Sequence, residues 1–268
     1  MNHITTSYGL IDGQSCRSHS WELREGGYRR VALLLGNGIW PAERDTRMIA
    51  FLLDRGFRVL ALDIAFGSTS APRVGLRAFR ESVVAFAQAN IDPELPFYVI
   101  AKSFSAGAIL SAASSIPGLA AAALLGPVVD FPPQRLKKSC FFLPRAELPI
   151  GAGDFCGEED LASALATEGL VPEKAALRFR KRELWTVASD LAATLGEGLA
   201  VPVGIFIGED DPFATPSGRA TIARSGAKVY TYPRIRHEPA RDRYADNFYA
   251  DFGAFLGEVE SSGPKKSG

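Results

Sequence analysis

Cysteine, histidine and net charge are all scarce in this sequence. Its 268 residues include three cysteines and three histidines, and 30 Lys and Arg balance 30 Asp and Glu. A chain without net charge has no general electrostatic reason to bind nucleic acid. Cys16, Cys140 and Cys156 are odd in number and lack metal-ligand spacing, so neither a disulfide scaffold nor a zinc site is expected. The sequence therefore predicts no metal, no cofactor and a reducing, cytoplasmic setting.

Signals for export and for membrane insertion are also missing. Residues 1–6 contain neither a basic nor an apolar stretch, so we expect no secretory signal. Residues 103–129 carry no charge over a length that could span a membrane. Pro117 and Gly118 interrupt this segment, however, and several serines dilute it. We interpret it as a buried helix, a turn and a buried strand, and we expect no membrane span.

The sequence does contain a regular alternation of short apolar runs and helical patterns. Residues 4–30 resemble a β-hairpin region. Later apolar runs predict strands at 31–35, 57–63, 97–101, 120–125, 203–207 and 227–232. Between them, helical patterns predict helices at 44–55, 76–89, 105–115, 217–223 and 242–256. Such an alternation predicts an α/β protein with a mostly parallel sheet covered by helices on both faces.

The alternation lapses between residues 131 and 200. This segment has prolines at both ends and helical patterns at 161–167 and 172–195. We interpret 131–200 as a helical cap insertion over the carboxyl end of the sheet, where open α/β sheets bind ligands. Residues 1–130 and 201–260 then form the core, and 261–268 a disordered tail.

A serine lies in a strand–turn–helix context after the strand at 97–101. This is the context of the G-x-S-x-G nucleophile elbow. In the run that follows, Ser103 replaces the first glycine and Gly107 keeps the second, which makes Ser105 the candidate nucleophile. A serine that only caps a helix is the plainer alternative.

A serine nucleophile needs a base and an acid that orients the base. His237 follows the last predicted strand, whereas His3 and His19 lie in the hairpin region. Asp211, with Asp210 in reserve, follows the strand at 203–207. The order Ser105, Asp211, His237 is that of the Ser-Asp-His triad of α/β-hydrolases. A surface histidine and turn-forming aspartates are the alternatives.

The oxyanion of an acyl transition state requires backbone donors. The N–H of Ala106, directly after the candidate serine, and that of Ile39, in the loop after 31–35, are suitably placed. A dinucleotide motif in that loop fails because Pro41 stands where the last glycine belongs. Candidates for contacts with the substrate are Trp40, Phe104 and Trp185.

Over nearly its whole length the chain resembles the α/β-hydrolase superfamily. Segments 208–211 and 236–238 are similar to its acid and base segments, particularly in monoacylglycerol-lipase and lysophospholipase-like members. Segments 37–38, 103–106 and 126–130 are similar to those of the acyltransferase branch that includes the myristoyl-acyl-carrier-protein thioesterase of bacterial bioluminescence. The resemblance implies an α/β-hydrolase fold and a serine hydrolase that cleaves acyl esters or thioesters.

Two questions stay open at this level. Basic residues of the insertion predict either a solvated helix face or a dock for an acidic acyl carrier protein; they are Arg135, Lys137, Lys138, Lys174, Arg178, Arg180, Lys181 and Arg182. Because a fold does not fix a function, the alternative to a hydrolase is a non-hydrolytic protein of the same fold, such as a lyase, a cyclase or a ligand-binding module.

Overall fold

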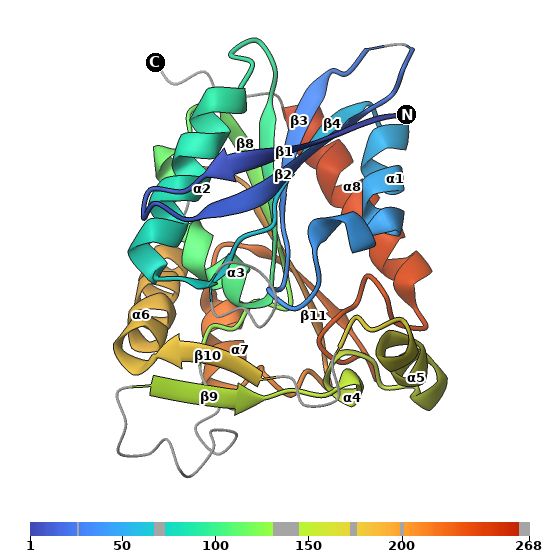
Figure 1. Cartoon of the computed structure of the whole chain (residues 1–268). Helices are drawn as coiled ribbons and strands as arrows, with labels where there is room; N and C mark the ends of the chain where they lie inside the picture. Colours follow the sequence, from blue (N-terminus) through green and yellow to red (C-terminus); the bar gives the residue numbers. More distant parts are fainter. Residues whose placement is uncertain (26, 67–72, 131–144, 172–175, 199–200, 263–268) are drawn as a thin grey trace.

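The computed structural model describes the whole chain except residues 26, 67–72, 131–144, 172–175, 199–200 and 263–268 (Figure 1). Eight strands form one sheet in the order β1-β2-β4-β3-β7-β8-β11-β12. β2 pairs antiparallel with β1 and β4, and all other pairs are parallel. The strand bounds are β1 Asn2–Gly9, β2 Ser15–Glu22, β3 Arg30–Leu35, β4 Phe57–Leu62, β7 Phe97–Lys102, β8 Leu119–Leu125, β11 Val203–Gly208 and β12 Lys228–Tyr232.

Helices cover both faces of this sheet, as the apolar strands predict. On one face lie α1 (Thr46–Asp54) and α8 (Ala245–Ser262), and the other carries α2 (Leu76–Asn90), α3 (Ser103–Leu110) and α7 (Pro216–Arg224). Alternate residues of β3 serve the two cores, because Leu33 packs with the α2 side and Leu34 with the α1 side. The predicted mostly parallel α/β architecture is confirmed.

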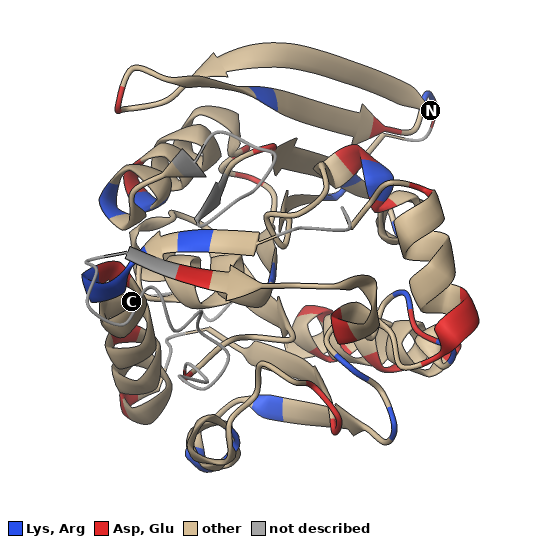
Figure 2. Cartoon of the chain, turned by 60° about the horizontal axis from the view of Figure 1, so that its bottom comes forward, with Lys and Arg blue, Asp and Glu red and all other residues tan. Residues whose placement is uncertain are grey.

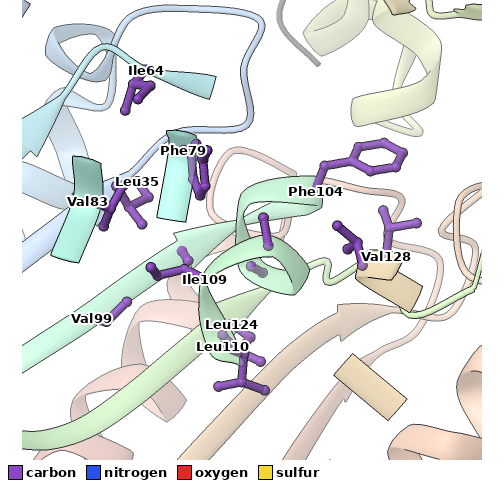
Figure 3. Close-up of a cluster of buried hydrophobic side chains, with 14 of the residues drawn as sticks. Leu35, Ile64, Phe79, Val83, Val99, Phe104, Ile109, Leu110, Leu124 and Val128 are labelled. Carbon is purple, nitrogen blue, oxygen red and sulfur yellow. The ribbon is translucent and has the colours of Figure 1, made fainter. Parts of the chain in front are cut away.

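Helix α3 is enclosed on all sides. Each of its eight residues is buried, and Figure 3 shows it among apolar side chains of the strands and helices around it. The helix begins at Ser103, two residues before the predicted start. This shift decides which serine stands at the end of β7.

The segment between β8 and β11 contains strands as well as helices. Its described elements are β9 (Arg145–Pro149), α4 (Ala152–Phe155), α5 (Glu159–Thr167), β10 (Ala176–Arg180) and α6 (Lys181–Glu197). β10 pairs antiparallel with β9, so the prediction of one helix over 172–195 is wrong at 176–180. The physical reason is visible in the burial of β10, where Leu177 and Phe179 are buried while Arg178 and Arg180 are exposed.

Of the described elements between β8 and β11, β9, β10, α4 and α5 lie at the carboxyl end of the sheet (Figure 1). Backbone hydrogen bonds join α4 to the loop after β12, from the His237 N–H to the Asp154 carbonyl (3.3 Å) and from the Glu238 N–H to the Phe155 carbonyl (3.1 Å). The division into core and cap stays a prediction. Residues 261–262 belong to α8, contrary to the predicted tail, and the remainder of that tail lies outside the described residues.

Two short strands, β5 (Ala65–Phe66) and β6 (Arg73–Val74), pair with each other outside the main sheet, and one-turn 3-10 helices lie at Ala42–Arg44 and Ala113–Ser115. Within the described parts of the chain, no helix is both long and apolar enough to cross a membrane.

Candidate active site

Ser103 stands at the junction between β7 and α3 in a strained backbone conformation. Its φ is +55°, in the left-handed region, and the only other non-glycine residue with a positive φ in the described chain is Arg234. That region costs an L-residue about 1–2 kcal/mol. Strain of this kind clusters at functional sites, where the surrounding structure enforces it. The turn presents Ser103 at the carboxyl edge of the sheet, as a nucleophile elbow does.

A chain of hydrogen bonds runs from Ser103 through His237 to Asp211. Oγ of Ser103 lies 2.7 Å from Nε2 of His237, and Nδ1 of His237 lies 2.9 Å from Oδ2 of Asp211. A carboxylate only accepts, so Nδ1 carries the ring proton and Nε2 accepts from the serine hydroxyl. The other oxygen of Asp211 accepts the Phe213 N–H at 2.8 Å, which fixes the carboxylate. All three side chains are buried.

The structure places Ser103, and not the predicted Ser105, in contact with His237. Ser105 lies inside α3, and its Oγ is buried without a hydrogen-bond partner among the described residues. The apolar run predicts a strand that ends at residue 101, but β7 continues to Lys102, and Ser103 therefore follows the strand directly. Ala101 and Ser105, two residues on either side of it, supply the small side chains that such a turn needs. This small-x-Ser-x-small pattern is the signal that could have identified Ser103.

Gly107 has a different role from the one predicted. A Cβ there would lie 2.9 Å from Cγ1 of Val187 and 3.3 Å from Cδ2 of Leu191, both on α6. The glycine therefore allows α6 to pack closely on α3, and it does not close the elbow.

The structure also shows where the predicted oxyanion donors, Ile39 and Ala106, lie. With Ser103 at the elbow, the next N–H belongs to Phe104, whereas Ala106 lies further inside α3. The N–H of Ile39 donates to Oδ1 of Asn37 at 3.0 Å. Asn37 itself is buried, and its amide nitrogen Nδ2 has no partner among the described residues. Asn37 and Ser103 each stand two residues beyond the paired residues Leu35 and Ala101, at the same edge of the sheet.

The three candidate substrate residues have different surroundings. Phe104 is buried, with its ring 4.6 Å from that of Phe179. Trp40 is also buried and donates from Nε1 to Oδ1 of Asp45 at 3.2 Å, which gives it a structural contact. Trp185 is 62 % exposed on α6. Phe104 directly follows the candidate serine in the chain, and the Trp40 ring packs 5.6 Å from that of Phe155, which flanks His237.

Apolar rings surround the candidate base. The ring centroid of His237 lies 4.5 Å from that of Phe213 and 5.7 Å from that of Phe155. On another side, a Cβ added at Gly126 would lie 2.6 Å from the His237 carbonyl oxygen. These neighbours hold the imidazole in a tightly packed, water-poor environment.

A buried charged cluster that the sequence analysis does not predict lies beside Ser103 and His237. Nζ of Lys102 lies 2.9 Å from Oδ1 of Asp45 and 2.9 Å from Oε1 of Glu238. Burial alone lowers the pKa of Lys102, but attraction to the two carboxylates outweighs it and raises this pKa above its usual value. Lys102 therefore stays charged at neutral pH. The available signal was a lysine at the end of an otherwise apolar strand.

Of the basic residues considered for docking, four lie outside the described residues: Arg135, Lys137, Lys138 and Lys174. Arg178 on β10 lies 3.8 Å from Glu147 on β9. Figure 2 shows Lys and Arg interspersed with Asp and Glu over the described elements.

Similarity to solved structures supports the architecture. The chain superposes on a soluble variant of monoglyceride lipase from Saccharomyces cerevisiae with a TM-score of 0.78 and 16 % identity, covering 95 % of this chain and 94 % of that one. A carboxyl esterase from Bacillus coagulans gives 0.74 at 15 % identity, with 97 % and 99 % covered. The thioesterase domain from the curacin biosynthetic pathway gives 0.64 at 14 %, with 96 % and 100 % covered.

These similarities, together with the sheet order, show that the chain has the α/β-hydrolase fold. The expected fold is thus confirmed. At the level of sequence, no protein-family model and no curated protein matches the chain.

Proposed function

We propose that the protein is a serine hydrolase that cleaves acyl esters or thioesters, with Ser103 as the nucleophile, His237 as the base and Asp211 as the acid that orients it. One observation carries the proposal: the 2.7 Å and 2.9 Å contacts that join these residues, with the serine in a left-handed elbow. A ligand-binding module has no need of such a chain of contacts around a strained serine.

The geometry supports a two-step mechanism. Nε2 of His237 takes the proton of Ser103 as Oγ attacks the acyl carbonyl carbon, and then gives it to the departing alcohol or thiol. This leaves an acyl group on Ser103. Water, activated by the same histidine, attacks the ester, releases the carboxylic acid and restores the serine. An acceptor other than water would make the same intermediate an acyltransferase step.

The negative oxygen of each tetrahedral intermediate needs hydrogen-bond donors. We assign the N–H of Phe104, which follows the nucleophile at the start of α3, and the amide Nδ2 of Asn37. The buried amide has no other partner among the described residues. Leaving a buried donor unpaired costs free energy, and an oxyanion would satisfy it.

The substrate class follows from the surroundings of the site and from the similar structures. Apolar rings flank His237, which suits an acyl chain. Among the similar proteins are a monoglyceride lipase, a carboxyl esterase in complex with glycerol, and a thioesterase domain. We therefore favour a small-molecule carboxylic ester, with acyl thioesters, including those of acyl carrier protein, as the second substrate class.

A panel of p-nitrophenyl esters, monoacylglycerols, acyl-CoA and acyl-carrier-protein thioesters tests the proposal. Ser103→Ala should lower kcat/KM at least about 1,000-fold and abolish labelling by a fluorophosphonate. Ser105→Ala is the matched control, because it removes the same hydroxyl two residues away, and it should keep both turnover and labelling. If the folded wild-type protein shows neither turnover nor labelling, this result would favour the alternative of a non-hydrolytic protein with the same fold.

The location of the protein in the cell is also part of this proposal. Cys16 and Cys156 are both free and buried, and the few cysteines fit a reducing compartment. On that ground we propose a cytoplasmic location.

A further inference from the structure

A second contact joins the chain neighbours of Ser103 and His237. Lys102 directly precedes the serine and Glu238 directly follows the histidine, and their side chains form an ion pair of 2.9 Å. Asp45 binds the same ammonium group at 2.9 Å. We call Lys102, Asp45 and Glu238 the Lys102 cluster; its side chains are at most 3 % exposed.

The Lys102 cluster joins three separate parts of the chain. Lys102 ends β7 on the face that Tyr98 and Ile100 present to α1 and α8. Asp45 immediately precedes α1, and Glu238 lies in the loop after β12. The loop that carries His237 is thereby tied to the end of the strand that carries Ser103.

Further contacts fix the cluster itself. The indole N–H of Trp40 donates to Oδ1 of Asp45, and the Arg241 guanidinium lies 3.5 Å from the same oxygen. Arg241 also donates to the Arg44 carbonyl. Asp45 is therefore a fixed anchor, and Lys102 cannot shift its ammonium group without losing two carboxylate contacts.

Stability alone is a poor reason for such a cluster. Charges removed from water lose their hydration, and well-packed apolar residues often replace buried ion pairs without loss of stability. Buried ion pairs do impose defined geometry, because each ammonium contact is lost when the partner moves. The Lys102 cluster constrains the geometry of the Ser103–His237 pair.

We propose that the Lys102 cluster positions the catalytic pair: by holding Glu238 against the end of β7, it keeps Nε2 of His237 in hydrogen-bonding reach of Ser103 Oγ. This rests on the proposed function, since proton transfer from Ser103 is what makes that distance matter. Lys102, Asp45 and Glu238 are thus positioning residues and do not touch the reacting atoms.

The double variant Lys102→Met/Glu238→Gln tests the proposal. It removes the ion pair while keeping the local charge balanced, because Asp45 still faces Arg241. We expect kcat and the rate of fluorophosphonate labelling to fall about 10- to 100-fold, with KM nearly unchanged, since misplacement by about 1 Å can cost 100-fold. Lys102→Arg keeps a cation and should recover most of the rate.

A matched control removes an ion pair far from the site. Arg30 lies 2.7 Å from Glu260 and starts β3, at the opposite end of the sheet from Ser103. Arg30→Met should leave kcat unchanged even if the melting temperature falls. Circular dichroism checks that every variant is folded. A loss of kcat in Lys102→Met/Glu238→Gln that is absent from Arg30→Met therefore cannot come from unfolding.

A readout that needs no turnover separates the two proposals. In protein labelled with [15N]histidine, the Nδ1–H of His237 reports its hydrogen bond to Asp211 among only three histidines. We expect this resonance to shift or exchange faster in Lys102→Met/Glu238→Gln and not in Arg30→Met. A folded double variant with wild-type kcat and an unchanged resonance overturns the positioning role and leaves the hydrolase intact. Wild-type protein without Ser103-dependent turnover or labelling overturns the hydrolase, and the positioning role with it.

Discussion

At the scale of single residues, the geometry of the proposed site depends on a glycine as well as on Ser103, His237 and Asp211. Gly126 directly follows β8 with a φ of +52°, and a Cβ there would lie 2.6 Å from the His237 carbonyl oxygen and 3.1 Å from its ring. Gly126→Ala must therefore displace His237. We expect kcat to fall about 100-fold and the free energy of unfolding to fall by about 2–4 kcal/mol, from backbone strain and overlap.

Gly118 provides the control for backbone strain alone. Its φ is +69°, but a Cβ there would meet no atom within 4 Å. Gly118→Ala should cost about 1–2 kcal/mol in urea unfolding and leave kcat as in the wild type. Equal activity of the two alanine variants would show that contact with Gly126 does not place His237.

The same scale shows which residues of the candidate site could be predicted. Asp211 and His237 follow from their order and from their place after predicted strands. The serine that contacts His237 stands two residues before the predicted one, because the end of β7 depends on tertiary partners. Lys102 lies buried at the end of the strand with its charge paired to Asp45 and Glu238, 57 and 136 residues away in the chain. A sequence window of the strand contains neither partner.

At the scale of elements, the close packing of α3 and α6 explains why residue 107 is a glycine. The sequence pattern predicts a different role for Gly107, at the elbow. Gly107→Val would place methyl groups where Val187 and Leu191 already pack. We expect it to lower the free energy of unfolding by about 1–3 kcal/mol, the usual cost of overpacking. Gly196→Ala on α6 is the control, since a Cβ there meets nothing within 4 Å. A Gly107→Val variant as stable as Gly196→Ala would argue against this packing.

Most helices and strands were predictable because their periodicity is local. The runs that became β3, β4 and β11 are almost uniformly apolar, which is typical of short strands buried on both faces. β9 and β10 were not predicted as strands. Each has only five residues. β10 is followed directly by α6, so the alternation of apolar and charged residues in β10 is difficult to distinguish from the longer helical pattern that follows. Each of these short strands is recognised as a strand only through its pairing with the other, and neither sequence alone indicates that pairing.

At the scale of the whole molecule, one buried carboxylate joins the N-terminal hairpin to the parallel sheet. Asp63, directly after β4, accepts from the Ala42 N–H (2.9 Å) and contacts Arg17 (3.0 Å) and the His19 ring (3.1 Å). Burial alone raises the pKa of Asp63, but the His19 and Ala42 hydrogen bonds and the charge of Arg17 outweigh it and lower this pKa below its usual value. The carboxylate is therefore held in its charged form by residues on both sides of the hairpin junction.

This lowered pKa predicts how stability depends on pH. The unfolded chain binds a proton at Asp63 near the usual value of about 3.9, whereas the folded chain binds it only at lower pH. The stabilisation is therefore fully present above the unfolded pKa, and it is lost as the pH falls through the folded one. Asp63→Asn should lower the free energy of unfolding by about 1.5–3 kcal/mol near neutral pH, the range for hydrogen bonds to charged groups.

Urea unfolding between pH 3 and pH 7 measures this dependence. The difference between wild type and Asp63→Asn should be largest near neutrality and shrink toward pH 3, because the unfolded chain then binds a proton at Asp63 more readily than the folded chain does. Exposed Asp54 gives the control, since Asp54→Asn makes the same change in net charge without touching the junction. A difference that stays constant down to pH 3 would mean that shape and hydrogen bonding, not the charge of Asp63, join the hairpin to the sheet.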